Sequence, residues 1–242
     1  MSTGHINADL KKFSFTDSEE FLTKTFLRLP VAHKPGTHFL YNTPATYMCS
    51  AIVQKVTGKT THDYLKERLF PHLGIKDSHW ETCPQGISLG GFGLNVKTED
   101  IAKLGQLYLQ HGEWEGQRLL PADWVDAATA RQTSNGSNPN SDWDQGYGYQ
   151  FWQCRHGAYR GDGAFGQFCL VLPDHDTVVA ITSGTDNMQG VMNVIWESLL
   201  PAVAPVALTE DADAHSALSR SLTQLELPGL QGDRFEKHAT AH

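Results

Sequence analysis

The chain lacks both a surplus of positive charge and any long run of apolar residues. Its 242 residues include 19 lysines and arginines against 27 aspartates and glutamates, which gives a formal charge of −8. Binding to a phosphate backbone requires a concentrated basic face, and here the cationic residues are scattered, so we expect no nucleic-acid partner. No apolar stretch reaches the ~18–20 residues that a membrane span requires, so we expect no membrane span.

Cysteine is scarce, and its spacing forms no motif. Cys49, Cys83, Cys154 and Cys169 are widely separated, without a C-x-x-C pair. We interpret them as free thiols in a reducing compartment. The residues that follow Met1 have neither the basic nor the apolar segment of a signal peptide, and we therefore expect a cytoplasmic location.

Metal-ligand patterns are also lacking. The twelve histidines include no H-E-x-x-H motif, and His33 with His38 have no third partner at ligand spacing. The sequence therefore predicts no metal site.

The first half of the chain does contain clear helical patterning. Thr43 is a favourable N-cap, Pro44 suits the first helical position, and Gly58 suits the residue after the last turn. These residues predict a helix over 43–58. Its apolar stripe at helical spacing consists of Tyr47, Met48, Ala51, Ile52 and Val56.

Other helices are indicated by similar signals. Thr16 with Glu19 has the form of a capping box and opens an amphipathic segment that runs to Leu29. Further helices are predicted over 61–70, 98–111 and 121–131.

The pattern changes after Thr133, where loop residues and then strands replace helices. Residues 133–146 are rich in Asn, Ser, Gly, Asp and Pro, which predicts a loop. Strands are predicted over 147–154, 166–172 and 177–183, with a turn at Pro173-Asp174, and a closing helix over 188–200. Helices followed by antiparallel strands and a closing helix indicate an α+β fold.

The composition also divides the chain into a folded part and a tail. From Ala204 onward the sequence is polar, mildly acidic and poor in aromatic residues. We therefore predict one domain over 1–203 and a polar, flexible tail over 204–242, which can end in a short helix around 217–225.

Two short motifs carry the functional signal. Tyr41-Asn42-Thr43 precedes a predicted helix, and Gly161-Asp162-Gly163-Ala164 lies among the predicted strands. With the segments 35–75, 90–112 and 147–184, they make residues 1–203 resemble the serine β-lactamase and penicillin-binding-protein-like hydrolases, in particular the class C and esterase-like group. The resemblance implies a β-lactamase/transpeptidase-like α+β fold, in which a helical region adjoins an antiparallel sheet covered by a C-terminal helix. It also implies a small-molecule acyl substrate and acyl-enzyme hydrolysis without a cofactor.

The first motif corresponds to the Tyr-x-Asn of that family, whose tyrosine acts as or near the general base. A hydroxyl nucleophile needs such a neighbour, and a tyrosinate forms only where cations lower the phenol pKa from about 10. Tyr41 matches the tyrosine. The third position, normally Asn, is Thr43, with Asn42 between them, and this departure favours ester over amide substrates.

The second motif corresponds to the family's Lys-Thr-Gly or His-x-Gly on an inner strand. The resemblance assigns the Ala164 N–H to the oxyanion hole, where one donor is typically worth ~3–4 kcal/mol of the barrier. The family's cationic residue is missing at Gly161, and Arg160 is a candidate replacement, although neighbouring strand residues point to opposite sides. Besides Tyr41 and Ala164, the residues expected to line the cleft are Asn42, Thr43, Arg160, Gly161, Asp162 and Gly163.

The family's third motif, Ser-x-x-Lys, is absent from the sequence. None of the lysines has Ser or Thr three positions before it. Family members carry this motif several tens of residues before the segment that residues 1–5 resemble, together with two strands of the sheet. We interpret the chain as the C-terminal three-quarters of such a hydrolase, without the N-terminal strands and nucleophile helix, and inactive as it stands.

Two alternatives remain open. A non-catalytic relative that binds a ligand or partner through the same cleft is suggested by the departures at Thr43 and Gly161. A G-x-S-x-G pattern at 86–90 would make Ser88 the nucleophile of an esterase. Such an elbow follows a strand and opens a helix, whereas Cys83-Pro84-Gln85 precedes Ser88 and a glycine-rich turn follows it.

Overall fold

The computed structural model describes residues 1–16 and 20–226, which belong to two compact units. The first unit is Met1–Val203, and the second begins at Ala204. The three hydrophobic clusters found among the described residues all lie in the first unit. That unit also contains both sequence motifs.

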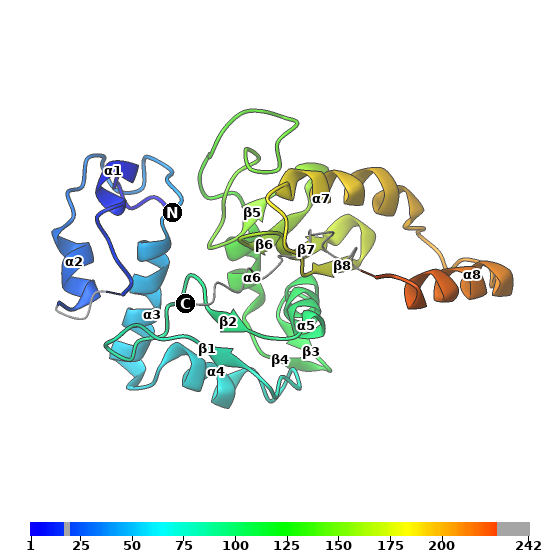
Figure 1. Ribbon diagram of the computed structural model, residues 1–242, viewed down its shortest axis with the longest axis horizontal. Helices are drawn as coiled ribbons and strands as arrows, with labels where there is room; N and C mark the ends of the chain where they lie inside the picture. Colours follow the sequence, from blue (N-terminus) through cyan, green and yellow to red (C-terminus); the bar gives the residue numbers. More distant parts are fainter. Residues whose placement is uncertain (17–19, 227–242) are drawn as a thin grey trace, which may run out of the picture. The chain divides into compact units, whose positions relative to one another are not determined.

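A four-stranded antiparallel sheet is the centre of the first unit (Figure 1). Its strands follow one another in chain order: β5 (Trp152–Gln153), β6 (Tyr159–Gly163), β7 (Gln167–Leu172) and β8 (Thr177–Ile181). Gly161 pairs with Cys169 and Cys169 with Ala180, which fixes the register of the three longer strands. The expected α+β architecture with an antiparallel sheet is confirmed.

Helices cover both faces of this sheet. Successive residues of a strand point to opposite sides, so each strand contributes side chains to both interfaces. Phe168, Leu170 and Leu172 of β7 pack against a cluster that includes Met192, Ile195 and Trp196. These come from α7 (Met188–Val194) and from the wider turn η3 (Ile195–Leu199), which continues as η4 (Leu200–Ala202). On the other face, α5 (Thr98–Leu109) contacts β7 and β8 through Gly105. The central strand β7 is therefore apolar along nearly its whole length.

The remaining helices form a separate region around two smaller clusters. One cluster joins α2 (Leu22–Arg28) to α3 (Thr43–Thr57), and the other packs below α4 (Thr61–Arg68). The short helix α1 (Asn7–Leu10) and the helix α6 (Ala122–Thr129) complete the set in this unit. Two small antiparallel pairs, which the sequence did not predict, are β1 (His79–Trp80) with β2 (Leu94–Asn95), and β3 (Glu113–Trp114) with β4 (Gln117–Arg118).

Helix α3 confirms the predicted helix, with two corrections. Gly58 adopts the left-handed conformation with φ 73°, as the C-terminal stop requires. The N-cap, however, is Asn42 rather than Thr43. The outer part of the predicted stripe is also wrong, since Ile52 and Val56 are 57% and 74% exposed. The helix packs through its inner face, which includes the buried Tyr47 and Ala51.

The helix predicted from Thr16 begins later than its signal. Helix α2 starts at Leu22, Thr16 lies in a turn, and Glu19, the other half of the predicted capping box, falls outside the described residues.

The strand predicted over 147–154 is wrong for most of its length. Only Trp152–Gln153 is a strand, because the chain reverses between Tyr147 and Trp152, which form an isolated bridge with each other. Gln150 has φ 67°, and a Cβ on Gly148 would lie 2.2 Å from the Ala128 carbonyl oxygen. The strands predicted over 166–172 and 177–183 are confirmed as β7 and β8, joined by the 3-10 turn η2 (Pro173–His175).

The second unit contains the helix α8 (Ala212–Thr223), which begins earlier than the helix expected around 217–225. The Asp211 carboxylate accepts a hydrogen bond from the Ala214 N–H at 2.8 Å and so caps the helix at that point. Every residue from Ala204 to Glu226 is exposed. Neither α8 nor any other helix in the described part of the chain is long and apolar enough to cross a membrane.

Candidate active site

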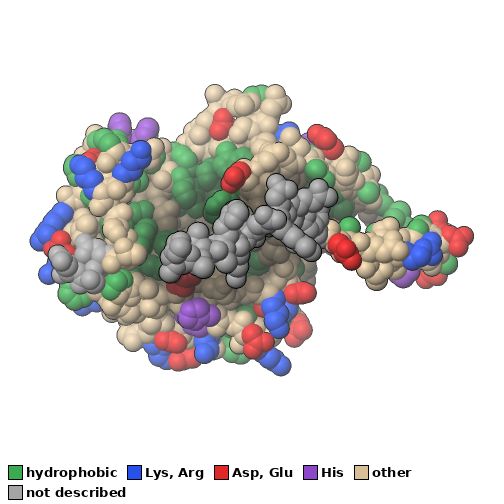
Figure 2. Space-filling model, viewed as in Figure 1, with side chains coloured by type: hydrophobic (Ala, Val, Ile, Leu, Met, Phe, Trp, Pro, Cys, Tyr) green, Lys and Arg blue, Asp and Glu red, His purple; other side chains and the backbone are tan. Residues whose placement is uncertain are grey.

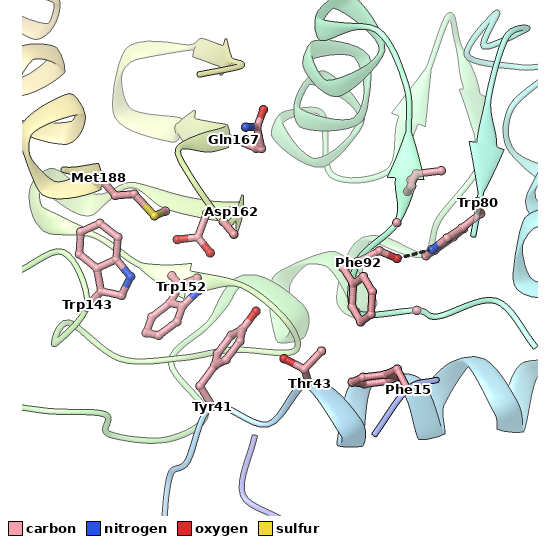
Figure 3. A pocket seen from close by; sticks show the side chains of 16 residues that line it. Phe15, Tyr41, Thr43, Trp80, Phe92, Trp143, Trp152, Asp162, Gln167 and Met188 are labelled. Carbon is pink, nitrogen blue, oxygen red and sulfur yellow. Dashed lines mark hydrogen bonds between the residues drawn. The ribbon is translucent and has the colours of Figure 1, made fainter. Parts of the chain in front are cut away.

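A pocket of about 920 Å³ lies where three segments of the first unit meet. These are the start of α3, the glycine-rich turn over 90–94, and the end of β6 (Figure 3). On the face shown in Figure 2, hydrophobic side chains gather in the hollow between α3 and the sheet. The apolar wall residues include Phe15, Trp80, Phe92, Trp143, Trp152 and Met188.

The start of α3 places Tyr41 and Thr43 in the pocket and turns Asn42 away from it. The buried Asn42 side chain accepts from the Ala45 N–H and donates to Thr3 Oγ1, both at 2.9 Å. It therefore caps the helix and does not line the pocket. The Tyr41 ring stacks on Trp152, with centroids 5.5 Å apart and an angle of 16° between the rings.

The turn over 90–94 can reach the pocket because glycine lets it approach α3 closely. A Cβ on Gly91 would lie 2.7 Å from Thr43 Cγ2, and one on Gly90 would lie 3.0 Å from the Thr46 carbonyl oxygen. This approach brings Phe92 to the pocket wall opposite Tyr41 (Figure 3). The Trp80 indole N–H donates to the Phe92 carbonyl at 2.8 Å and holds the turn in place.

The end of β6 supplies the polar side of the pocket. Asp162, Gly163 and Ala164 line it, together with Gln167 at the start of β7. Arg160, two residues before Asp162 on the same face of the strand, is completely buried and does not line it. Its Nε and Nη2 lie 3.0 and 2.9 Å from Asp162 Oδ2. Gly161 points to the other face and is also outside the pocket.

The environment shifts the pKa values of the two ionisable residues in the pocket. Partial burial raises the pKa of Tyr41 above its ordinary value, and the nearby Asp162 carboxylate raises it further. Burial also raises the pKa of Asp162, with the Arg160 guanidinium acting against that rise. The Tyr41 phenol is therefore protonated at neutral pH, and none of the described residues lowers its pKa as a tyrosinate base would require.

A buried carboxylate, Asp142, supports the sheet side of the site from below. Arg155, Gln189 and Trp196 all donate to its side chain, and its carbonyl oxygen accepts from Arg160 Nη1 at 2.7 Å. Asp142 thus connects the loop over 133–146 to Arg160 and, through it, to Asp162.

Of the residues expected in the cleft, the structure brings five together and leaves three outside. Tyr41, Thr43, Asp162, Gly163 and Ala164 line the pocket, whereas Asn42, Arg160 and Gly161 do not. Sequence reasoning missed the aromatic walls and Asp142. For the aromatic walls, the sequence signal was the set of glycines over 90–93, which predicts a close approach of the backbone. Asp142, a buried polar residue in a loop, had no sequence signal.

Other candidate groups lie elsewhere. Ser88 is completely buried and bridges to Thr82 in extended backbone, so it does not form a nucleophile elbow. The rings of His33 and His38 stack 4.2 Å apart. In the described part of the chain, no three His, Cys, Asp or Glu residues gather as a set of metal ligands.

The fold, a helical region beside an antiparallel sheet covered by helices, is β-lactamase/transpeptidase-like. It is shared by the octameric penicillin-binding protein homologue from Pyrococcus abyssi, which matches 84% of this chain and 55% of its own with a TM-score of 0.64 and 18% identity. A provisionally assigned 6-aminohexanoate-dimer hydrolase from Bacillus anthracis also matches, over 84% of this chain and 57% of its own, with a TM-score of 0.66 and 22% identity.

The sequence comparisons define the family. The family model for β-lactamase matches residues 4–202, and the chain therefore belongs to the β-lactamase family. The 6-aminohexanoate-dimer hydrolase of Paenarthrobacter ureafaciens is 26% identical to this chain over 171 residues, which are 67% of this chain and 42% of that protein. The chain thus spans less than half the length of that relative.

Proposed function

We propose that this chain forms the substrate pocket of a β-lactamase-family hydrolase that cleaves an ester or an amide through an acyl-enzyme. The observation that carries the proposal is the meeting of the two sequence motifs, more than a hundred residues apart, in one pocket. Tyr41 and Thr43 line it from the start of α3, and Gly163 and Ala164 line it from the end of β6. Proton transfer and stabilisation of an oxyanion are the two functions that such a reaction needs beside a nucleophile.

The nucleophile itself would come from a Ser-x-x-Lys segment, which these 242 residues do not contain. Its serine oxygen would attack the acyl carbon, and the Ala164 N–H would stabilise the negative charge that develops on the acyl oxygen. Because the Tyr41 pKa is raised here, we assign Tyr41 to proton donation, or to a base role only beside the lysine of that segment. The alcohol or amine would leave with a proton as its bond to the acyl carbon breaks, and a water molecule would then hydrolyse the acyl-serine ester to release the acid and restore the serine hydroxyl.

The substrate class includes both amides and esters. The relative from Paenarthrobacter ureafaciens is named for hydrolysis of a 6-aminohexanoate dimer, which supports an amide. Thr43 in place of the family's asparagine favours an ester. The pocket is large enough for an extended acyl compound, since pockets for small ligands are typically ~300–1,000 Å³.

The test is to fuse to Met1 the Ser-x-x-Lys-bearing segment of the Paenarthrobacter relative and to assay p-nitrophenyl butyrate and a linear amide. We expect the 242-residue chain to form no fluorophosphonate adduct and the fusion to form one on the introduced serine. Turnover should disappear on replacing that serine by Ala, and Tyr41→Phe should lower kcat by about 10²-fold or more. A folded fusion that labels but hydrolyses neither substrate would contradict the proposal.

A second candidate is a non-catalytic relative that binds a ligand through the same pocket. It is supported by Thr43 and Gly161, which depart from the family's motifs, and by the raised Tyr41 pKa. Binding of acyl compounds by the fusion, without labelling and without turnover, would favour it over the hydrolase.

A further inference from the structure

In the described part of the chain, the side chains that line the pocket carry charge of one sign only. Of the sixteen described residues that line it, Asp162 is the only one with a carboxyl, ammonium, guanidinium or imidazole side chain, and its carboxyl group lies 2.9 Å from the Arg160 guanidinium. Tyr41 stays neutral because its pKa is raised. A ligand with an anionic group at this position would have to leave water and face a carboxylate, with no cation among the described lining residues to offset the loss of hydration.

The partner of Asp162 leaves part of this carboxylate available to a ligand. Arg160 is completely buried, and both its Nε and its Nη2 contact the same oxygen, Oδ2. The Trp152 side chain, like Arg160, acts to lower the pKa of this carboxyl group. A carboxylate offers about four acceptor positions, so these donors do not saturate it. The Asp162 side chain keeps 8% of its surface exposed, and it is Asp162 rather than Arg160 that lines the pocket.

The buried Arg160 guanidinium lies against the rings of Trp143 and Trp152. Its guanidinium carbon lies 4.4 Å from the centre of the Trp143 ring and 5.4 Å from that of Trp152. The ion pair therefore has a direction, with the cation inside the protein and the carboxylate at the pocket surface. Its negative end faces the ligand.

The rest of the lining is suited to a ligand that is apolar along its length. In Figure 3 the Asp162 carboxylate and the Tyr41 hydroxyl point into the same space, with Met188 and Trp143 beside them. Phe15, Phe92 and Trp80 form the opposite wall. Aromatic faces attract cations as well as apolar groups, and a carboxylate beside them strengthens the attraction of a cation.

We propose that this pocket selects ligands that carry an ammonium group next to Asp162 on an apolar chain, and that it discriminates against carboxylates at that position. The inference rests on the proposed function in treating such a ligand as the substrate. The binding preference itself needs no nucleophile and can be measured on the 242-residue chain.

The experiment compares three probes with the same six-carbon chain: n-hexylamine, 1-hexanol and hexanoate. Binding to the 242-residue chain at pH 7 is followed by calorimetry and by the fluorescence of the pocket tryptophans. We expect hexylamine to bind about tenfold or more tightly than hexanoate, with hexanol between them. Added salt should weaken the binding of hexylamine and leave that of hexanol unchanged.

Variants locate the effect at Asp162. Asp162→Asn should reduce hexylamine affinity about tenfold while hexanol affinity is kept, and Asp162→Glu should retain the preference for the amine. Gly161→Ala, next to Asp162 but outside the pocket, is the matched control and should bind as the wild type does. If Asp162→Asn does not fold, the ranking of the three probes and the salt dependence on the wild type still decide the proposal.

Equal binding of amine and carboxylate, a preference for hexanoate, or no binding of any probe at millimolar concentration would overturn the inference. Amine preference together with a fusion that shows no turnover would retain the inference and reject the hydrolase. Turnover by the fusion without a preference for the amine would retain the hydrolase and reject the inference.

Discussion

Among single residues, Asp142 holds together more of the site than any motif residue does. Its Oδ2 accepts from Arg155 Nη2 at 2.8 Å, from Gln189 Nε2 at 2.7 Å and from Trp196 Nε1 at 3.0 Å. Its Oδ1 accepts from the Arg155 N–H at 3.0 Å. Burial alone would raise the pKa of this carboxyl, but these hydrogen bonds outweigh burial and hold the pKa below its ordinary value.

We predict that Asp142→Asn is strongly destabilising. The variant leaves the Arg155 guanidinium, which is 22% exposed, without its counter-charge. Breaking a buried pair by removing one partner typically costs ~3–5 kcal/mol, and urea unfolding followed by circular dichroism would measure it. The control is Asp126→Asn, which removes an exposed contact to His111 and should cost less than ~1 kcal/mol.

The pH dependence of this effect follows from the lowered pKa. The unfolded chain binds the Asp142 proton more readily than the folded one, so stability from Asp142 is fully present above the ordinary carboxyl pKa of about 3.9. It is lost as the pH falls through the lower pKa of the folded state. The difference in unfolding free energy between wild type and Asp142→Asn should therefore be constant near neutral pH and shrink below about pH 4. A difference that grows on acidification would contradict the assignment.

The sequence predicts a residue of the site only where that residue belongs to one of the two motifs. Tyr41 and Asp162 were predicted because they lie within the motifs, and both line the pocket. Phe92 and Trp152 were not, since they reach it only through the approach of the 90–94 turn to α3 and through the hairpin at Gln150. Such contacts between distant segments leave no local pattern in the sequence.

At the scale of elements, the packing of α5 on the sheet depends on one glycine. Gly105 lies inside the helix, where Ala has a higher helix propensity by ~1 kcal/mol. A Cβ at this position would lie 2.5 Å from Val178 Cγ1 and 3.0 Å from Cys169 Sγ, which belong to β8 and β7. The steric conflict exceeds the gain in propensity, because valine is stiff and the interface is closely packed.

We predict that Gly105→Ala lowers stability by about 1–3 kcal/mol in spite of the better helix former. Thermal and urea unfolding would measure the loss. Gly161→Ala is again the matched control, because no atom lies within 4 Å of its added Cβ, and its stability should change by less than ~0.5 kcal/mol. A Gly105→Ala protein that is more stable than the wild type would show that α5 can move away from the sheet.

Elements were predictable where both ends carry a local signal. Helix α3 has Pro44 and Gly58 at its ends, and β7 and β8 are bounded by the Pro173 turn. The segment 147–154 has the composition of a strand, but its conformation is set by Gly148, which fits against the Ala128 carbonyl. In that segment a tertiary contact overrides strand propensity.

At the scale of the whole molecule, the core and the pocket belong to the same part of the chain. The three clusters of buried residues and the described residues that line the pocket lie between Met1 and Val203. From Ala204 to Glu226 every residue is exposed, including the apolar Leu218, Leu222 and Leu225. Burial of apolar area is the main source of stability, and in the described part of the chain the buried clusters lie before Ala204.

We therefore predict that a chain ending at Val203 folds and binds as the 242-residue chain does. Its melting temperature should change by less than ~2 °C, because in a chain of this size 1 kcal/mol corresponds to about 2–4 °C. Circular dichroism should show the loss of the helical signal of α8, and affinity for hexylamine should be unchanged. A fall in melting temperature of more than ~5 °C would place part of the core beyond Val203 and would reject the proposed domain boundary.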